Sequence, residues 1–165
     1  MKKLFIAIMY SNKEEYDKVK TILETKFGNI KAESHPYNFD QFTSFYEKEM
    51  GKNLVKTFIV FNKGIEKKDL VKIKQQTTEV EKEFAVNNNR IINLDPGYLS
   101  EKELVLASFK RGTNYKEDLG EGVYAHKVLE FKDGKAEIFW HTFPDYRVEE
   151  NQEFFISMIN QNKIQ

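Results

Sequence analysis

The sequence predicts an α+β fold: a ferredoxin-like antiparallel sheet core, followed by a C-terminal helix, β-hairpin and helix. Three observations lead to this prediction. Over residues 4–94, strand-like apolar runs and helical periodicity follow one another in the order β-α-β-β-α-β. No periodic helix separates the second predicted strand from the third, although the alternative, a flavodoxin-like wound sheet, would need one. The pair Asp133-Gly134 lies between two strand-like segments and is the strongest short signal for a hairpin.

Composition limits the class of protein. The 165 residues suffice for one core and contain no repeat or linker, so we expect a single domain over residues 1–165. The absence of cysteine excludes disulfides and iron–sulfur clusters and fits a cytoplasmic protein. The net charge of zero does not favour nucleic acid as a partner. No apolar run approaches the ~18 residues of a membrane span, so we expect no membrane anchor.

The first third of the chain predicts a strand, a helix and a weaker strand. Residues 4–10 are continuously apolar, which is typical of a buried central strand. A helix is expected from about residue 11 to a stop at Gly28. Residues 30–39 predict a second strand that Pro36 interrupts, and a proline is tolerated there if the strand lies at an edge of the sheet.

The middle of the chain repeats this alternation. Residues 40–53 are irregular and rich in aromatic and polar side chains. Residues 54–61 predict a strong third strand. Residues 62–64 predict a turn into a long helix, whose apolar face ends at Phe84. Residues 90–94 predict a short fourth strand.

The C-terminal part is predicted to extend the core. Ser100 and Glu103 have the spacing of a capping box, so we predict a third helix from Ser100 to about Phe109. Residues 111–122 predict a polar connection.

A hairpin and a helix are predicted to complete the chain. Residues 123–131 and 136–140 form the two hairpin strands around the Asp133-Gly134 turn. Residues 148–162 predict the last helix, with an apolar face that includes Phe155.

Two segments carry a concentration of polar chemistry. Residues 93–99 (Asn-Leu-Asp-Pro-Gly-Tyr-Leu) and residues 140–147 (Trp-His-Thr-Phe-Pro-Asp-Tyr-Arg) each lie where a predicted strand ends and a helix begins. Loops at strand ends often carry function. Pro96-Gly97 fits the centre of a type II turn, with Asp95 at the end of the fourth strand. We expect the two segments to face each other across one hollow.

The candidate site residues divide by chemistry. Arg147 and Lys110, with Lys56 nearby, are predicted to hold an anion, because guanidinium and ammonium groups bind phosphate and carboxylate. Carboxylates are candidates for a base or a metal ligand, and aromatic rings for the wall. The carboxylates are Asp95, Glu49 and Asp145; the rings are Tyr98, Tyr124 and Trp140.

Structural alternatives stay open for these residues. Asp95 could cap its own turn, and Asp145 could cap the last helix. Arg147 could form an ion pair with Asp145, with Asp95 or with an acid of a helix. Lys110 could interact with the carboxyl end of the predicted third helix.

A divalent metal such as magnesium is a further option, because hard cations need few protein oxygens. Glu49 and Asp40 could supply such oxygens. His126 and His141 lie nearly opposite each other across the predicted hairpin, so they could bind a metal together with Asp145 or Glu49, or merely pack. The sequence carries no haem or phosphate-loop signal: Gly51-Lys52 is followed by asparagine, and the earlier glycine of that motif is missing.

Five segments together resemble a known family. They are Leu4-Phe5 to Tyr10-Ser11, Glu49-Met50-Gly51, residues 93–99, Gly122-Val123-Tyr124-Ala125 and Phe143-Pro144-Asp145-Tyr146. On these segments the chain is similar, over nearly its full length, to an uncharacterised bacterial family, a domain of unknown function numbered 4416. The resemblance implies a soluble one-domain bacterial protein and brings no established activity. The family commonly has an acid after the Tyr-Ala pair, where this chain has His126.

Two functional hypotheses follow. The first is a pocket between strand-end loops that binds a small anionic, phosphate-bearing ligand, with hydrolase or transferase activity left open. The alternative is a non-catalytic module that binds RNA or protein through an aromatic sheet face, since aromatic residues make up 14% of the chain. The rings that could form that face are Tyr10, Tyr37, Phe39, Tyr46, Phe58, Tyr98, Tyr124 and Trp140. Either a monomer or a homodimer paired through an exposed sheet edge is compatible with the sequence.

Overall fold

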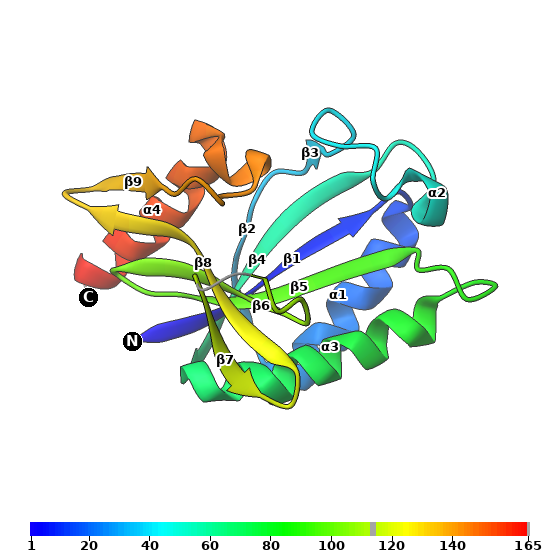
Figure 1. The fold of residues 1–165 in the computed structure, drawn as a ribbon, viewed down its shortest axis with the longest axis horizontal. Helices are drawn as coiled ribbons and strands as arrows, with labels where there is room; N and C mark the ends of the chain where they lie inside the picture. Colours follow the sequence, from blue (N-terminus) through cyan, green and yellow to red (C-terminus); the bar gives the residue numbers. More distant parts are fainter. Residues whose placement is uncertain (113–114, 165) are drawn as a thin grey trace.

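The computed structural model describes residues 1–112 and 115–164, with side chains as far as residue 161. The helices are α1 (Lys13–Phe27), α2 (Glu47–Met50), α3 (Leu70–Phe84) and α4 (Glu149–Ile164), with 3-10 turns η1 (Lys67–Asp69) and η2 (Pro144–Arg147). The strands are β1 (Lys2–Tyr10), β2 (Ile30–Glu33), β3 (Tyr37–Asn38), β4 (Val55–Ile65), β5 (Ile92–Leu99), β6 (Glu103–Ser108), β7 (Lys116–Gly120), β8 (Val123–Lys132) and β9 (Lys135–Ile138). Helices and an antiparallel sheet together confirm the α+β class (Figure 1).

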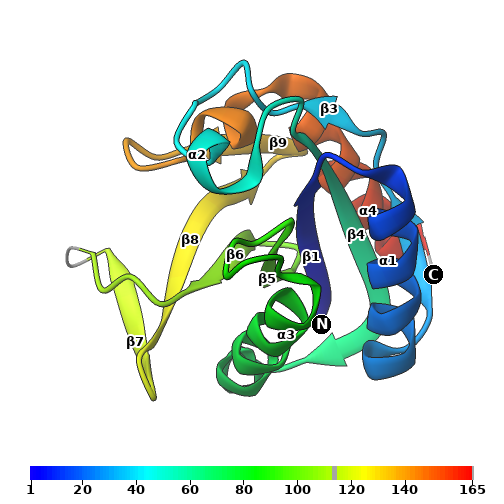
Figure 2. The same cartoon turned by 90° about the vertical axis from the view of Figure 1, so that its right-hand side faces the viewer.

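The described strands form one nine-stranded sheet with the order β2-β4-β1-β5-β6-β8-β7, in which β3 also pairs with β4 and β9 with β8. Every pair is antiparallel. The connection β1–α1–β2 passes over β4, and the connection β4–α3–β5 passes over β1. The long strand β8 pairs with β7 at one end and with β9 at the other, so it links the two ends of the molecule (Figure 2).

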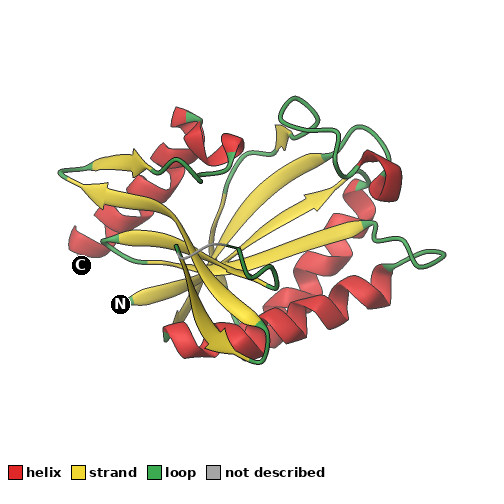
Figure 3. Ribbon diagram, in the orientation of Figure 1, coloured by secondary structure: helices red, strands yellow, loops and turns green. Residues whose placement is uncertain are grey.

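Helices cover both faces of the sheet. Apolar side chains of α1 and α3 pack with Ile6 and Phe61 in one core. Phe155 and neighbouring residues of α4 pack with Phe5 and Phe58 in a second core on the other side of the strands. Figure 3 shows α1 and α3 together below the strands and α4 apart from them. Tyr10, Phe58 and Tyr98 are buried in these cores, so these three rings are not available to an aromatic sheet face.

The turn predicted at Pro96-Gly97 is wrong, because β5 continues through it as far as Leu99. The whole strand pairs with β1, from Tyr10 opposite Ile92 to Lys3 opposite Leu99. Gly97 is needed for a close approach: a Cβ there would lie 2.7 Å from the Phe5 ring and would also collide with the backbone of β6. The pair of residues therefore serves strand packing, and Asp95 lies inside a strand.

The helix predicted from Ser100 to Phe109 is also wrong, because this segment forms strand β6. The Ser100 hydroxyl does accept the backbone N–H of Glu103, but it does so in the turn that joins β5 to β6. Residues 104–107 are all buried, because both faces of this strand are covered. Such a continuous apolar run gives no periodicity that separates a strand from a helix.

Other helix and strand boundaries differ from those predicted from the sequence. The turn expected at residues 62–64 is part of β4, which continues to Ile65. The predicted second strand divides around Pro36 into β2 and β3, and β2 lies at an edge of the sheet as expected. Strand β7 lies within the segment predicted as a polar connection.

The hairpin is confirmed. Asp133 and Gly134 both have positive φ, at 51° and 75°, as the expected two-residue turn requires. No helix among the described residues is long and apolar enough to cross a membrane.

Candidate functional site

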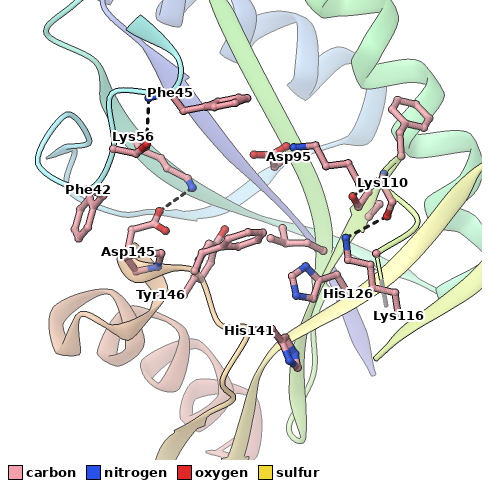
Figure 4. Close-up of a pocket in the computed structure, with 18 of the residues that line it drawn as sticks. Phe42, Phe45, Lys56, Asp95, Lys110, Lys116, His126, His141, Asp145 and Tyr146 are labelled. Carbon is pink, nitrogen blue, oxygen red and sulfur yellow. Dashed lines mark hydrogen bonds and ion pairs between the residues drawn. The ribbon is translucent and has the colours of Figure 1, made fainter. Parts of the chain in front are cut away.

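A cavity of about 900 Å³ opens on the α4 side of the sheet. Its floor comes from strands β4, β5, β6 and β8, and its described walls come from residues 39–46, 108–112, 115–116 and 143–146 (Figure 4). The floor is split, because β5 pairs with β6 only from Gly97 to Leu99. Among the described strands, β1 alone pairs with β5 towards its start, and Asp95 lies in this part. The strand geometry thus opens the sheet where polar side chains gather.

One wall holds a buried ion pair. Lys56 Nζ lies 2.7 Å from Asp145 Oδ2, and both side chains are less than a tenth exposed. The Tyr37 hydroxyl donates to the same oxygen at 2.6 Å. The Lys56 ammonium also lies 5.0 Å from the ring centres of Phe39 and Tyr146. Burial and the neighbouring Asp145 raise the pKa of Tyr37, so it keeps the proton that it donates.

Asp95 lies in the middle of the floor. Its Oδ1 is 3.7 Å from Lys74 Nζ, which reaches the cavity from α3. Its Oδ2 accepts a hydrogen bond from Asn93 Nδ2 at 3.0 Å. About a third of the Asp95 side chain is exposed, whereas that of Asp145 is almost completely buried. Of the two acids in the described lining, Asp95 is therefore the one accessible to a ligand.

A polar network supports Asp95 from behind. Arg90 donates from Nη1 to the Asn93 side chain at 2.7 Å and from Nε and Nη2 to Glu49 at 2.9 and 3.0 Å. These bonds lower the pKa of Glu49 and fix its carboxylate on Arg90. The neighbouring Glu81 is buried, which raises its pKa to about 7, and accepts the Leu94 backbone N–H at 2.7 Å.

The opposite wall carries two lysines that form no ion pair with any carboxylate of the described residues. Lys116 Nζ donates to the Lys110 carbonyl at 3.1 Å. Lys110 Nζ lies 5.5 Å from the centre of the Phe45 ring, which belongs to another wall of the cavity. Burial and the nearby Lys110 lower the pKa of Lys116. Two positive charges therefore face the cavity with no compensating acid among the residues that the structure places.

An aromatic cluster closes one end of the floor. His126 and His141 have ring centres 5.1 Å apart, so the expectation that they meet is confirmed. Tyr115 stacks on His141 at 4.1 Å, and Phe143 lies edge-on to His126 at 5.0 Å. His141 Nε2 donates to the Lys127 carbonyl at 3.0 Å, since a carbonyl can only accept.

Three buried polar atoms of this lining have no hydrogen-bond partner among the described residues. They are His126 Nε2, His141 Nδ1 and the Tyr146 hydroxyl oxygen. His126 and Tyr146 are 2% and 1% exposed. Buried polar groups are normally paired, and an unpaired one carries an energetic penalty. The three unpaired atoms thus all belong to residues that line the cavity.

The structure brings together three of the eight residues expected at the site: Asp95, Asp145 and Lys110 all line the cavity. Loop 143–147 and β5 thus face one hollow, although Asp95 reaches it from a strand. Asp145 directs Oδ2 to Lys56 and Tyr37. Lys110 follows strand β6 rather than ending a helix.

The other five lie outside the lining. Arg147 donates to the backbone carbonyls of residues 142, 139 and 140 at 2.9, 3.0 and 3.1 Å, which fixes the loop before α4. Glu49 binds Arg90. Tyr98 is buried and donates to Glu103. Two further aromatic residues lie nearby without lining the cavity: Tyr124 stands opposite Ser108 in β8, and Trp140 is 77% exposed.

The arrangement of the described residues gives little support to the metal sites considered from the sequence. Among the described residues no group of three or more histidines or acids is placed to hold an ion. The Glu49 oxygens bind Arg90, and Asp40 Oδ2 accepts the Asn53 backbone N–H at 2.6 Å.

Two cavity lysines were missed by the sequence reasoning. Lys74 lies on the buried face of α3 beside Ile73 and Thr77, so a charged residue on an apolar helical face was a usable signal. Lys116 lies in β7, a strand of charged and half-exposed residues that carries no apolar alternation. No local feature of the sequence indicated that Lys116 would line the cavity.

One comparison with known proteins gives a result. The family model described as "Domain of unknown function (DUF4416)" matches residues 1–161, so the chain belongs to this family. No curated protein matches the chain at a significant level, and no solved structure does.

Proposed function

We propose that this member of the DUF4416 family binds a small dianion, of the phosphate-monoester type, in the cavity between β6, β8 and the loops around it. The observation that carries the proposal is the pair Lys110 and Lys116, which face the cavity without an acid partner among the described residues. Ammonium groups placed in this way bind phosphate oxygens strongly.

The charge balance of the lining supports a ligand with two negative charges. Four lysines and two acids line the cavity in the described part of the chain, so positive charge exceeds negative by two. They are Lys56, Lys74, Lys110, Lys116, Asp95 and Asp145. Lys56 and Lys74 lie next to the two acids, which leaves the excess on the wall of Lys110 and Lys116.

Aromatic rings support an apolar or flat portion in the same ligand. Phe45 and Phe109 line the cavity and are 71% and 49% exposed. Large exposed rings beside ammonium groups favour a molecule that combines an anion with a ring or chain. For hydrolase or transferase chemistry we place the general base at Asp95, because its carboxylate is the accessible one.

Calorimetry and thermal unfolding test the proposal with inorganic phosphate and phenyl phosphate. A ligand that binds the native state stabilises it by mass action, by about 2.7 kcal/mol at roughly a hundredfold excess over Kd. Both compounds should raise the Tm of the wild type, and phenyl phosphate should bind more tightly.

Two double variants test whether phosphate binds in this cavity or elsewhere on the surface. Lys110→Met with Lys116→Met should weaken phosphate binding at least about tenfold. Lys26→Met with Lys135→Met removes the same charge from exposed positions on α1 and β9 and should bind like the wild type. Absence of any phosphate effect on the wild type, or equal losses in the two double variants, would refute the proposal.

We also infer that the first half of the chain is a ferredoxin-like unit. The strand order β2-β4-β1-β5, with two helical connections that each pass over one strand, supports this assignment.

A further inference from the structure

His126 stands out among the cavity residues because it is both buried and unpaired. It projects from β8 onto the floor, where Figure 4 shows it between Tyr146 and Lys116. The residue is 2% exposed, and its Nε2 has no hydrogen-bond partner among the described residues. The rest of the ring is held by packing against Tyr115, His141 and Phe143.

The groups that face this imidazole oppose a positive charge on it. Lys116 lies opposite His126 in the β7–β8 register, and β6 places the uncharged Leu106 on the other side. The rings of Tyr115 and His141 also lie against His126, and neither residue is a carboxylic acid. Burial, then Lys116, then His141 lower the pKa of His126 to about 4. The ring is therefore neutral in the free protein at physiological pH.

An anion bound at the wall of Lys110 and Lys116 would instead favour the positively charged form of His126. Its negative charge would lie beside an imidazole that has an unsatisfied nitrogen and no other acid partner in the described structure. Opposite charge within hydrogen-bond range favours the charged form of a histidine. The same contact would satisfy the buried nitrogen, which removes a penalty present in the empty cavity.

We infer that His126 takes up one proton from solvent when the dianion binds, and that the resulting imidazolium donates a hydrogen bond from Nε2 to an anion oxygen. The inference rests on the proposed function. No covalent bond forms or breaks apart from the new N–H bond on the ring. His126 thus makes binding of the anion dependent on pH, with tighter binding at lower pH.

The sign of the pH dependence follows from linkage. Binding that takes up a proton weakens as the pH rises, by up to about tenfold per pH unit while the pH lies between the free and the bound pKa of the histidine. Phosphate itself changes charge near neutral pH, which would obscure this effect. Inorganic sulfate remains a dianion throughout the range, so it is the probe that isolates the protein's contribution.

The test is calorimetry of sulfate binding between about pH 5 and about pH 8 in buffers of different ionisation enthalpy. Wild-type protein should take up close to one proton per sulfate, and its affinity should fall at least about tenfold across the range. His126→Gln keeps a hydrogen-bonding amide near the Nε2 position but cannot take up a proton, so its affinity should vary less than about twofold. His35→Gln, which replaces the exposed histidine before β3, is the matched control and should behave like the wild type.

The outcomes separate this inference from the proposed function. Sulfate binding without proton uptake would overturn the role of His126 and leave the anion site in place. Proton uptake that persists in His126→Gln would assign the proton to another group, such as His141 or Lys116, and would equally overturn it. Ring-nitrogen NMR signals of the three histidines report which imidazole changes state. Failure of both sulfate and phosphate to bind would remove the site itself and the inference with it.

Discussion

The two lysine-bearing walls of the cavity use the same side chain for different purposes. On one wall, Lys56 is buried against Asp145 at 2.7 Å and surrounded by aromatic rings. On the other wall, Lys110 and Lys116 have no acid partner among the described residues, and Lys110 is exposed. We call these the paired wall and the unpaired wall. On the paired wall the protein's own carboxylate compensates the lysine charge, whereas the unpaired wall leaves a positive charge that a ligand can neutralise.

The difference teaches how to separate structural from binding lysines in one cavity. A buried charge must be compensated by the protein itself, because the folded state would otherwise carry a large desolvation penalty. A cation that is exposed like Lys110, or partly exposed like Lys116, keeps more of its hydration and needs no such partner. Removing charge should therefore affect folding at the paired wall and ligand affinity at the unpaired wall.

The largest expected effect is at the paired wall. Asp145→Ala would leave the Lys56 ammonium buried without its carboxylate and the Tyr37 hydroxyl without its acceptor. Breaking a buried pair from one side typically lowers the free energy of unfolding by about 3 to 5 kcal/mol. Urea unfolding monitored by circular dichroism measures this change.

Two companion variants sharpen this prediction. Tyr37→Phe removes one hydrogen bond but leaves both charges paired, so it should lower the free energy of unfolding less, by about 1 to 3 kcal/mol. Combining Lys56→Met with Asp145→Ala removes the stranded charge and should recover part of the loss. If Asp145→Ala unfolds at the wild-type urea concentration, the paired wall is not a structural element.

The smallest effect on stability is expected at the unpaired wall. Lys110→Met with Lys116→Met removes no described ion pair, so the free energy of unfolding should stay within about 0.5 kcal/mol of the wild type. Loss of one hydrogen bond to the Lys110 carbonyl is offset by relief of repulsion between the two ammonium groups. A loss as large as that of Asp145→Ala would mean that both walls are structural, and the comparison would fail.

Local signals in the sequence were enough for much of the fold. The apolar run of β1, the amphipathic faces of α1 and α3, and the Asp133-Gly134 turn each reflect their own residues, and the structure confirms them. Gly97 was misinterpreted because its role depends on Phe5, which is distant in the chain. Strand β6 was misinterpreted because neighbours on both faces bury it, which removes the alternation that identifies a strand.

The candidate site shows the same contrast between local signals and contacts with distant residues. Asp95 and Asp145 were recognisable as polar residues next to predicted strand ends, and Lys110 as a cation at the end of a predicted helix. The partners that define their roles were not, because Lys56 meets Asp145 across 89 residues of sequence. Arg147 resembled an anion ligand in sequence, yet three backbone carbonyls of its own loop use its guanidinium. Contacts of this kind depend on the tertiary fold.

The central claim, that the unpaired wall holds an anion, is tested most directly by a crystal structure of the wild-type protein in the presence of tungstate. Tungstate is a dianionic analogue of phosphate, and its anomalous scattering locates it without ambiguity. We predict one tungstate ion in the cavity, in contact with Lys110 and Lys116 and with an oxygen facing His126 Nε2. Tungstate found only at exposed lysines such as Lys26, with the cavity free of it, would contradict the account.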